Sequence, residues 1–369
     1  MKNQIFELFG HHVDDKSAKA EHYRKNCICP FTNNLCDGGG NRYQTFLSKN
    51  DVDKNGLTEY FSKELKIVPP GVCSLNVKDV KWIVCPRRIF SFSNSDKKNY
   101  HTNFVASLLN KYCQLEKDTK RIGIWSEVKV KYKEDTDDDE AKSFDYTFDY
   151  IVASLGSKRI TEIANSLKIT VAKVRKLAED NGYTVAVRGD DYFIEDFPIG
   201  KLNIIEIMTS STSGGNKNKD TTIQQSFINA IKGNQHESPR INYRQVWARM
   251  VSQLIVKSQI GAAWGSKTLW ILQDSLSDYI TQSTDLNLAK LISQVSKEVN
   301  LVSIKYGSDT DENGCLKLEE HHLYAGEIPK ITSDTDFNKL LQAAIIPDMN
   351  EISCKLILKP IRNKIELNS

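Results

Sequence analysis

The chain of 369 residues has no long apolar run and almost no net charge. A membrane-spanning helix needs about 20 predominantly apolar residues, and no stretch of this sequence approaches that length. The first residues, MKNQIFELFGHHVDD, carry histidines and aspartates where a secretory signal would need an apolar segment. We therefore expect a cytoplasmic protein with no membrane partner. Its eight cysteines are then not expected to form a disulfide framework.

A net charge of only +3 excludes a basic field over the whole molecule, so any surface for nucleic acid must be local. A hydrophobic content of 40% and a charged content of 26% are typical of a soluble globular protein. The length suits two domains, or one large core that carries an insertion.

Two segments alternate polar and apolar residues with a period of two, which predicts strands with an acidic face. Residues 202–208 place Glu206 among isoleucines, and residues 143–150 place Asp145 and Asp149 among aromatic residues. If the two strands are neighbours, Asp145 and Glu206 could share one hard cation. Solvated strand faces explain the same pattern, because acidic residues on strands are common.

The cysteines divide into an early group and three scattered residues. The scattered ones are expected to be small buried hydrophobes, and they are Cys113, Cys315 and Cys354. Four early cysteines have turn-forming neighbours of the kind found on metal-binding loops, and they are Cys29, Cys36, Cys73 and Cys85. Four thiolates suit zinc or a single iron equally. The alternative is buried free thiols, and Cys27 is the spare residue under either interpretation.

Residues 157–197 predict two short helices, a tight turn between them and a hairpin, which together make a winged helix-turn-helix. Thr170 is the expected N-cap of the second helix. We expect this module to contact DNA through Lys168, Thr170, Lys173, Arg175 and Lys176. A structural mini-domain with solvated lysines is the alternative.

The remaining segments have simpler interpretations. We expect helices at 100–116 and 241–260, strands at 122–132, 267–274 and 353–361, and a plain turn at 51–56. The acidic run at 134–140 is expected to be a solvated hairpin tip. The loop that follows residue 208 could contact phosphates through Lys217, or could be a solvated linker. Arg244, Gln245 and Arg249 flank the buried face of the helix at 241–260 and could project towards the site.

Six short motifs occur in an order that resembles the NotI-type restriction endonucleases. They are LFGHHV near the start, CPF at 29–31, GVC at 71–73, WIVCP at 82–86, SFDY at 143–146 and IIEIMT at 204–209. The resemblance implies a PD-(D/E)xK nuclease fold, a mixed sheet with helices on both sides, working as a homodimer on palindromic duplex DNA. It also implies that the four cysteines hold one metal ion, reported as iron for the family, and that Asp145 and Glu206 bind the catalytic divalent metal.

Two features depart from that family pattern. Met208 stands where most PD-(D/E)xK enzymes have lysine and where the NotI-type pattern has glutamine, and a thioether cannot orient water as an amine or amide does. Asp149, Glu127 or Gln245 could assist instead. The module at 157–197 lies between the two acidic strands and is treated as an added DNA-reading unit.

These observations lead to one expected organisation and three functional hypotheses. The expected regions are a metal-stapled N-terminal region at 1–98, a nuclease core at 99–156 and 198–369, and the insertion at 157–197. The main hypothesis is a type II restriction endonuclease that uses Mg²⁺ held by Asp145, Glu206 and the Ile207 carbonyl, leaves a 5′-phosphate, and has a cognate DNA methyltransferase in the cell. The rivals are a DNA-binding regulator with an inactive nuclease core and a scaffold that binds no nucleic acid.

Overall fold

The computed structural model describes residues 3–39, 46–93, 99–133, 143–284, 286–328 and 346–367. Its centre is an eight-stranded mixed sheet with the order β15-β14-β13-β12-β10-β9-β16, and β11 pairs with β12. The strands are β9 (Arg121–Lys133), β10 (Ser143–Arg159), β11 (Val185–Arg188), β12 (Asp191–Met208), β13 (Thr268–Gln273), β14 (Val299–Thr310), β15 (Leu316–Gly326) and β16 (Asn363–Glu366). Strands β12, β13 and β14 run parallel, and the other pairs are antiparallel.

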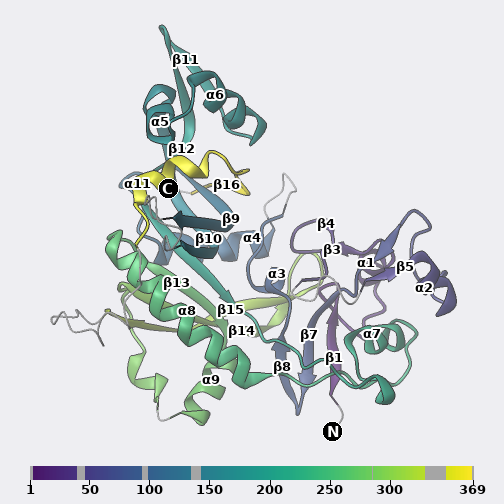
Figure 1. Ribbon diagram of the computed structural model, residues 1–369. Helices are drawn as coiled ribbons and strands as arrows, with labels where there is room; N and C mark the ends of the chain where they lie inside the picture. The colour runs from purple at the N-terminus through teal and green to yellow at the C-terminus, as the bar shows by residue number, and fades with distance from the viewer. Residues whose placement is uncertain are drawn as a thin grey trace.

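Helices cover both faces of this sheet (Figure 1). Helix α4 (Tyr100–Tyr112) packs against Ile205 and Ile207 of β12. Helix α8 (Tyr243–Ala263) makes the crossover from β12 to the parallel strand β13, and it lies on the opposite face. Helix α9 (Asp274–Ser283) then connects β13 towards β14 through the short helix η3 (Leu288–Leu291). The expected α/β class, with a mixed sheet flanked by helices, is confirmed.

The N-terminal region has its own four-stranded antiparallel sheet with the order β2-β1-β7-β8. Its elements are β1 (Gln4–Leu8), β2 (His11–His12), α1 (Ala18–Lys25), β3 (Ile28–Cys29), β4 (Asn34–Leu35), β5 (Leu47–Ser48), α2 (Lys49–Lys54), β6 (Ile67–Val68), β7 (Val72–Val77), β8 (Val80–Ile83) and α3 (Pro86–Ile89). This region shares one apolar core with α7 (Ile223–Ile231) and α8. In that core the ring centroids of Phe9 and Phe227 are 6.4 Å apart.

Residues 157–197 form a module that projects from one end of the sheet (Figure 1). Helix α5 (Ile160–Leu167) ends at Lys168, and helix α6 (Val171–Asp180) follows at once. The Thr170 side chain accepts a hydrogen bond from the Lys173 N–H and caps α6 as predicted. Strand β11 and the first part of β12 form the hairpin. Because β10 and β12 both continue from the central sheet into the module, with register shifts after Val152 and Gly156, the two parts share backbone.

Two local predictions were wrong. The apolar residues at 353–356 belong to helix α11 (Met349–Leu356), and the last strand is β16, at 363–366, rather than 353–361. The expected turn at 51–56 begins inside helix α2, which Ser48 caps. The predicted helices at 100–116 and 241–260 and the strands at 122–132 and 267–274 correspond to α4, α8, β9 and β13. Residues 134–140 lie outside the described part of the chain. Within that part, no helix is long and apolar enough to cross a membrane.

Candidate active site

A cleft of about 410 Å³ opens where α3, β9, β10, β12 and α8 meet. Six of its lining residues are ones that the sequence analysis singles out, and they are Glu127, Asp149, Ile207, Met208, Gln245 and Arg249. The cleft therefore brings together residues that are far apart in the chain. Its lining also includes Arg87 of α3 and Tyr150, the neighbour of Asp149.

The carboxylate that meets Glu206 belongs to Asp149. Tyr150 pairs with Ile205 in the register of β10 and β12, which places Asp149 opposite Glu206. The Asp149 N–H donates to Glu206 Oε1 at 3.2 Å, and the Ile207 N–H donates to Asp149 Oδ2 at 3.0 Å. Asp149, half-buried, lines the cleft, whereas Glu206 is fully buried. The two acids thus lie side by side, with Asp149 on the cleft side.

Asp145 does not take the position expected for it. It pairs with Lys131 on β9, is exposed, and lies four residues from Asp149 along β10, or about 13 Å at strand spacing. Strand β12 ends at Met208, so no residue of that strand lies opposite Asp145. The predicted pair of Asp145 and Glu206 is therefore corrected to Asp149 and Glu206. Alternation could not separate the two aspartates, because residues four apart share a strand face.

Strand β10 changes the face on which its even-numbered side chains lie between Phe148 and Tyr150, and Asp149 is at this change. Tyr146 and Phe148 pack into the core below α8, whereas Tyr150 and Val152 pack into the opposite core with α4. The neighbouring strand β9 has positive φ at Glu127, at 51°. Such a left-handed residue is costly for a side chain other than glycine. It occurs where the strands change face and where Glu127 lines the cleft.

Lys257 is a residue of the site that the sequence analysis does not single out. Its Nζ donates to Glu206 Oε2 at 2.6 Å, and both side chains are buried. Burial and the nearby Asp149 raise the pKa of Glu206 to about 8, although Lys257 acts in the opposite direction. A signal was present, since Lys257 continues the buried helical spacing of Val246, Met250 and Leu254 at i+3 and i+4. A lysine on such an apolar face requires a partner.

The other predicted residues of the catalytic site lie around the cleft. Met208 is buried and packs in the apolar core with α8. Ile207 lines the cleft beside Asp149. Gln245 is exposed, and its Oε1 accepts a hydrogen bond from Asn242 at 2.7 Å. Arg249 and Arg244 are exposed on α8, but only Arg249 is among the lining residues.

The early cysteines lie together in the N-terminal region. Cys29, Cys73, Cys85 and Cys315 form one buried cluster, and Cys36 packs against it. This thiol cluster contains all four predicted metal ligands, and Cys315 is an addition that the sequence pattern did not indicate. Cys27 packs in a different core, and its thiol is near the Arg24 carbonyl oxygen at 3.7 Å. Cys113 and Cys354 are buried elsewhere, as expected.

Burial raises the pKa of most thiols in the cluster, although Arg88 acts in the opposite direction on Cys315. Burial and the neighbouring Cys85 raise the pKa of Cys29 to about 11. Burial and the nearby Cys29 and Cys85 also raise the pKa of Cys36. A hydrogen bond between the Cys73 and Cys85 thiols raises the pKa of Cys73 and lowers that of Cys85. Backbone N–H groups point at two sulfurs, from Gly10 to Cys73 Sγ at 3.3 Å and from Gly38 to Cys36 Sγ at 3.4 Å.

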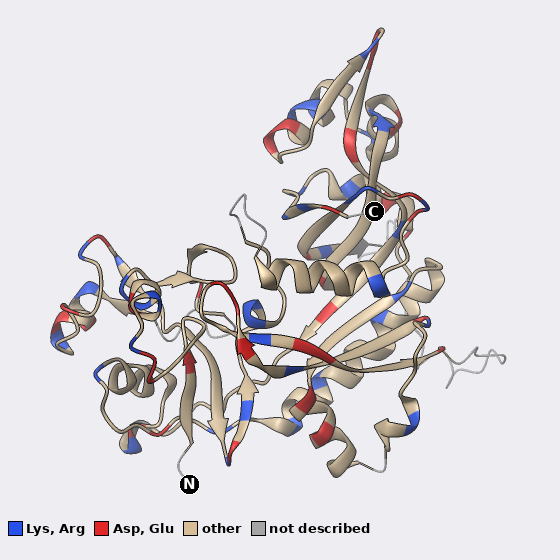
Figure 2. Cartoon of the chain, turned by 180° about the vertical axis from the view of Figure 1, so that it is seen from behind, with Lys and Arg blue, Asp and Glu red and all other residues tan. Residues whose placement is uncertain are grey.

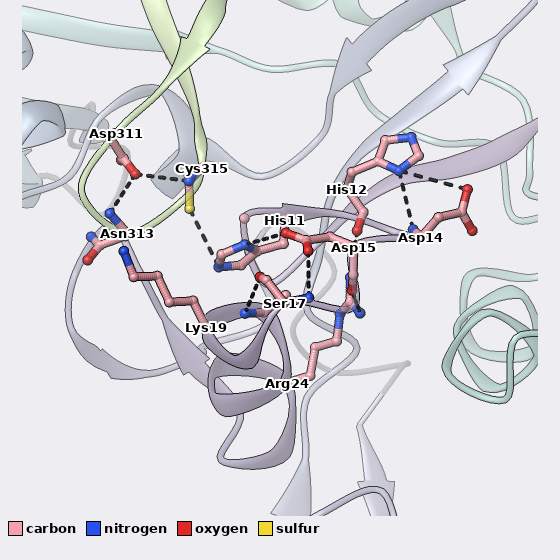
Figure 3. Close-up of polar contacts among 12 residues, drawn as sticks. His11, His12, Asp14, Asp15, Ser17, Lys19, Arg24, Asp311, Asn313 and Cys315 are labelled. Atoms are coloured by element: carbon pink, nitrogen blue, oxygen red, sulfur yellow. Dashed lines mark hydrogen bonds and ion pairs between the residues drawn. The ribbon is translucent and has the colours of Figure 1, made fainter.

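The sulfurs are close but do not form a coordination shell. Among the described residues, no group of three or more His, Cys, Asp or Glu side chains has the arrangement of a metal site. At the edge of the thiol cluster, Cys315 Sγ is 3.9 Å from His11 Nε2, and His11 Nδ1 is 3.3 Å from Asp15 Oδ2 (Figure 3). Burial lowers the pKa of His11, so the neutral imidazole is favoured there.

The predicted DNA-contacting residues of the module are on its surface. Lys168, Thr170, Lys173, Arg175 and Lys176 are all exposed. Arg175 is engaged by Glu179 at 3.0 Å and lies over the Tyr192 ring at 4.7 Å. Over the described residues, Figure 2 shows Lys and Arg interspersed with Asp and Glu along the chain. Lys217 begins the short helix η2 (Lys217–Lys219), and its side chain is outside the described set.

No protein-family model, curated protein or solved structure matches this chain.

Proposed function

We propose that this chain is a Mg²⁺-dependent endonuclease that cuts double-stranded DNA at specific sites, in the manner of a type II restriction enzyme. One observation carries the proposal: Asp149 and Glu206 adjoin on neighbouring strands at a cleft, with the buried amine of Lys257 in contact with Glu206. Two acids and a lysine at one cleft are the groups that metal-assisted phosphodiester hydrolysis uses. Lys257 would supply from α8 the amine that Met208 lacks.

The donor set fits a hard divalent cation. Burial raises the pKa of Glu206 to about 8, and repulsion by the neighbouring Asp149 carboxylate adds to this shift. A cation between Asp149 and Glu206 would relieve that repulsion, and the Ile207 carbonyl is the expected third oxygen ligand. When bound there, Mg²⁺ supplies charge that polarises the phosphate and lowers the pKa of water.

The residues of the chain would divide the work of hydrolysis as follows. The carboxylates of Asp149 and Glu206 would bind the cation, and the Ile207 N–H orients one Asp149 oxygen by donating a hydrogen bond to it. Lys257, hydrogen-bonded to Glu206, favours the ionised form of that carboxyl against the effect of burial. The water oxygen attacks phosphorus, the bond from phosphorus to the 3′ oxygen breaks, and the products are a 5′-phosphate and a 3′-hydroxyl.

The surrounding architecture supports the same proposal. A mixed sheet flanked by helices is what a PD-(D/E)xK nuclease requires, and both acids lie on central strands of that sheet. The module at 157–197 has the two helices and the hairpin of a winged helix-turn-helix, and its exposed cations would contact duplex DNA. Recognition of a palindromic site would need a homodimer, and a cognate DNA methyltransferase would protect the host.

We propose that the thiol cluster holds one structural ion, zinc or iron, and that binding would draw its sulfurs into the coordination shell that they do not form without the ion. Cys29, Cys36, Cys73 and Cys85 supply four soft ligands in a buried site, and the two N–H groups that point at sulfur would stabilise thiolates. A bound cation would reverse the upward pKa shifts that burial imposes on the thiols.

The nuclease proposal is tested by three matched alanine variants. Purified wild type, Asp149→Ala, Glu206→Ala and Asp145→Ala are incubated with phage DNA and Mg²⁺, and the cut ends are sequenced. We expect discrete fragments from the wild type and from Asp145→Ala, and at least about a 10³-fold loss of rate in the other two. Cleavage by Asp149→Ala at the wild-type rate would refute the assignment.

The second candidate, a DNA-binding regulator with an inactive core, is favoured by the apolar Met208 and by the exposed cations on α6. It predicts sequence-specific shifts in a binding assay and no cleavage under Mg²⁺ or Mn²⁺. The same digestion experiment therefore separates the two candidates. Failure to bind any duplex at low salt would instead support the scaffold.

A further inference from the structure

Two consecutive arginines in helix α3 lie in very different surroundings. Arg88 is fully buried and is fixed by Glu7, whose Oε1 is 3.2 Å from its Nη2. Glu7 also accepts from Tyr306 at 2.7 Å and from Ser74 at 2.8 Å. Arg88 is therefore satisfied within the protein. Arg87 points the other way and lines the cleft beside Asp149.

Two hydrogen bonds hold the Arg87 guanidinium in place and leave other N–H donors of the group for a ligand. Its Nε donates to Asp37 Oδ2 at 3.1 Å, and its Nη1 donates to the Tyr150 hydroxyl at 2.7 Å. Tyr150 directly follows Asp149, so the bond ties Arg87 to the acidic strand. Arginine has five N–H donors in a rigid fork, and these two bonds use two of them.

The backbone on both sides of Arg87 is also fixed. Cys85 precedes α3, and its N–H donates to the Cys73 carbonyl oxygen at 3.2 Å. On the other side, the buried ion pair of Arg88 with Glu7 anchors the helix. Because the backbone and the guanidinium of Arg87 are already fixed, the side chain loses little conformational entropy when it binds a ligand.

The charge of the cleft explains why a cation is needed at this point. Asp149, Glu127 and Asp37 bring negative charge to or near the cleft, and a phosphodiester adds more. An arginine fork matches two phosphate oxygens, and such charge-assisted bonds are stronger than neutral ones. Arg87 is the arginine of the cleft that is linked by a hydrogen bond to the acidic strand.

We propose that Arg87 is a catalytic residue that binds a phosphate of the DNA backbone in the cleft, with Tyr150 as its positioning residue. This inference rests on the proposed nuclease function, because it takes DNA as the ligand of the cleft. It assigns a substrate contact to α3, an element to which the motif comparison gave no catalytic role.

The test compares Arg87→Gln and Arg87→Lys with Lys290→Gln, which removes one exposed positive charge from η3 outside the cleft. Duplex DNA that the wild type cuts or retains is used in two assays. Binding is measured by fluorescence anisotropy across a salt series with Ca²⁺ in place of Mg²⁺, and the single-turnover cleavage rate is measured with Mg²⁺. Thermal unfolding of each variant shows whether the fold is intact.

We expect Arg87→Gln to reduce the cleavage rate by about 10²-fold and to lower the slope of log K against log salt by about one. Arg87→Lys should recover the salt slope but only part of the rate, because an ammonium lacks the fork. Tyr150→Phe should leave the salt slope unchanged and slow cleavage by about 3- to 10-fold. Lys290→Gln should alter neither quantity.

An unchanged salt slope for a folded Arg87→Gln protein would overturn the inference, as would cleavage within about twofold of the wild type. The binding assay needs no turnover, so it decides on Arg87 even if the wild type fails to cut. Absence of cleavage by the wild type under Mg²⁺ or Mn²⁺ is instead the failure of the nuclease proposal. A wild type that binds no duplex overturns both.

Discussion

The acidic cleft and the thiol cluster are both sheltered groups of acids, but a lysine is hydrogen-bonded to an acid beside the cleft, whereas the arginines near the thiol cluster act on its sulfurs through space. Glu206 receives a hydrogen bond from Lys257 at 2.6 Å, whereas the thiols of Cys73 and Cys85 interact with each other and with backbone N–H groups. Lys257 therefore compensates Glu206 directly, whereas burial favours the protonated, neutral form of Cys29, Cys36 and Cys73. On the proposals above, the ion pair of Glu206 with Lys257 suits a site that exchanges its ion and admits a substrate. The thiol cluster suits an ion that is permanently bound.

The largest effect should follow from breaking the thiol cluster. Cys73→Ser is expected to lose bound metal and soluble yield together, because the binding energy of a structural ion is folding energy. That energy, about 10 kcal/mol or more, is comparable to the whole stability of a domain. Elemental analysis and yield are measured against Cys354→Ser, a buried cysteine in another core. Normal metal content in soluble Cys73→Ser protein would contradict the staple.

Lys257→Met removes the ammonium group that is hydrogen-bonded to Glu206. Above pH 8, where Glu206 is ionised, it would then be a buried carboxylate without its partner, which costs about 3 to 5 kcal/mol. Urea unfolding should show this loss, and the double variant with Glu206→Gln should recover most of it. Both variants should fail to cleave DNA. Full stability of the single variant would mean that the ion pair contributes nothing to the fold.

Gly10→Ala tests how tightly the thiol cluster is packed. Gly10 has φ of +78°, and an added Cβ would lie 2.5 Å from Pro30 Cγ and 2.8 Å from Cys315 Sγ. Gly182 has nearly the same φ, +81°, with nothing within 4 Å of the added atom. Both substitutions carry a left-handed strain of about 1 to 2 kcal/mol, and only Gly10→Ala adds about 1 to 3 kcal/mol of overpacking. Equal losses in thermal unfolding would contradict this difference.

The last expected effect is a pH dependence of the cleft. The pKa of Glu206 rises from 4.5 to about 8 on folding, so between these values the folded state binds more protons than the unfolded state. Stability should therefore fall as pH rises from about 4.5 to 8 and should level off above that. Glu206→Gln should lack this slope. Mg²⁺ should raise the melting temperature of the wild type at pH 8, and an equal rise in Glu206→Gln would contradict the assignment.

Sequence reasoning reached the parts of these sites that depend on local pattern. The turn-forming neighbours of Cys29 and Cys85 identified the cysteines that converge, and the alternation around Glu206 identified its strand. The Thr170 cap and the apolar spacing of α5 and α6 similarly predicted the elements of the module. In each case the information lies within about ten residues of the chain.

The remaining parts depend on tertiary register. Asp145 and Asp149 are equivalent by alternation, and only the pairing of Tyr150 with Ile205 across the insertion selects Asp149. Lys257 was on the predicted helix, but its partner lies 51 residues away. Cys315 joins the thiol cluster from the far end of the sheet, by way of a hairpin between β14 and β15 whose position no local pattern could indicate.

The long strand β10 fixes the distance between the cleft and the module at 157–197. Ten residues separate Asp149 from Arg159, where the strand ends in the module, and at about 3.3 Å a residue this spans roughly 33 Å. One turn of B-form DNA is about 34 Å long. If the module grips a duplex, its contacts and the point of hydrolysis would therefore lie on the same side of the double helix, one turn apart. The distance between the bases read and the bond broken would then be set by the length of a strand.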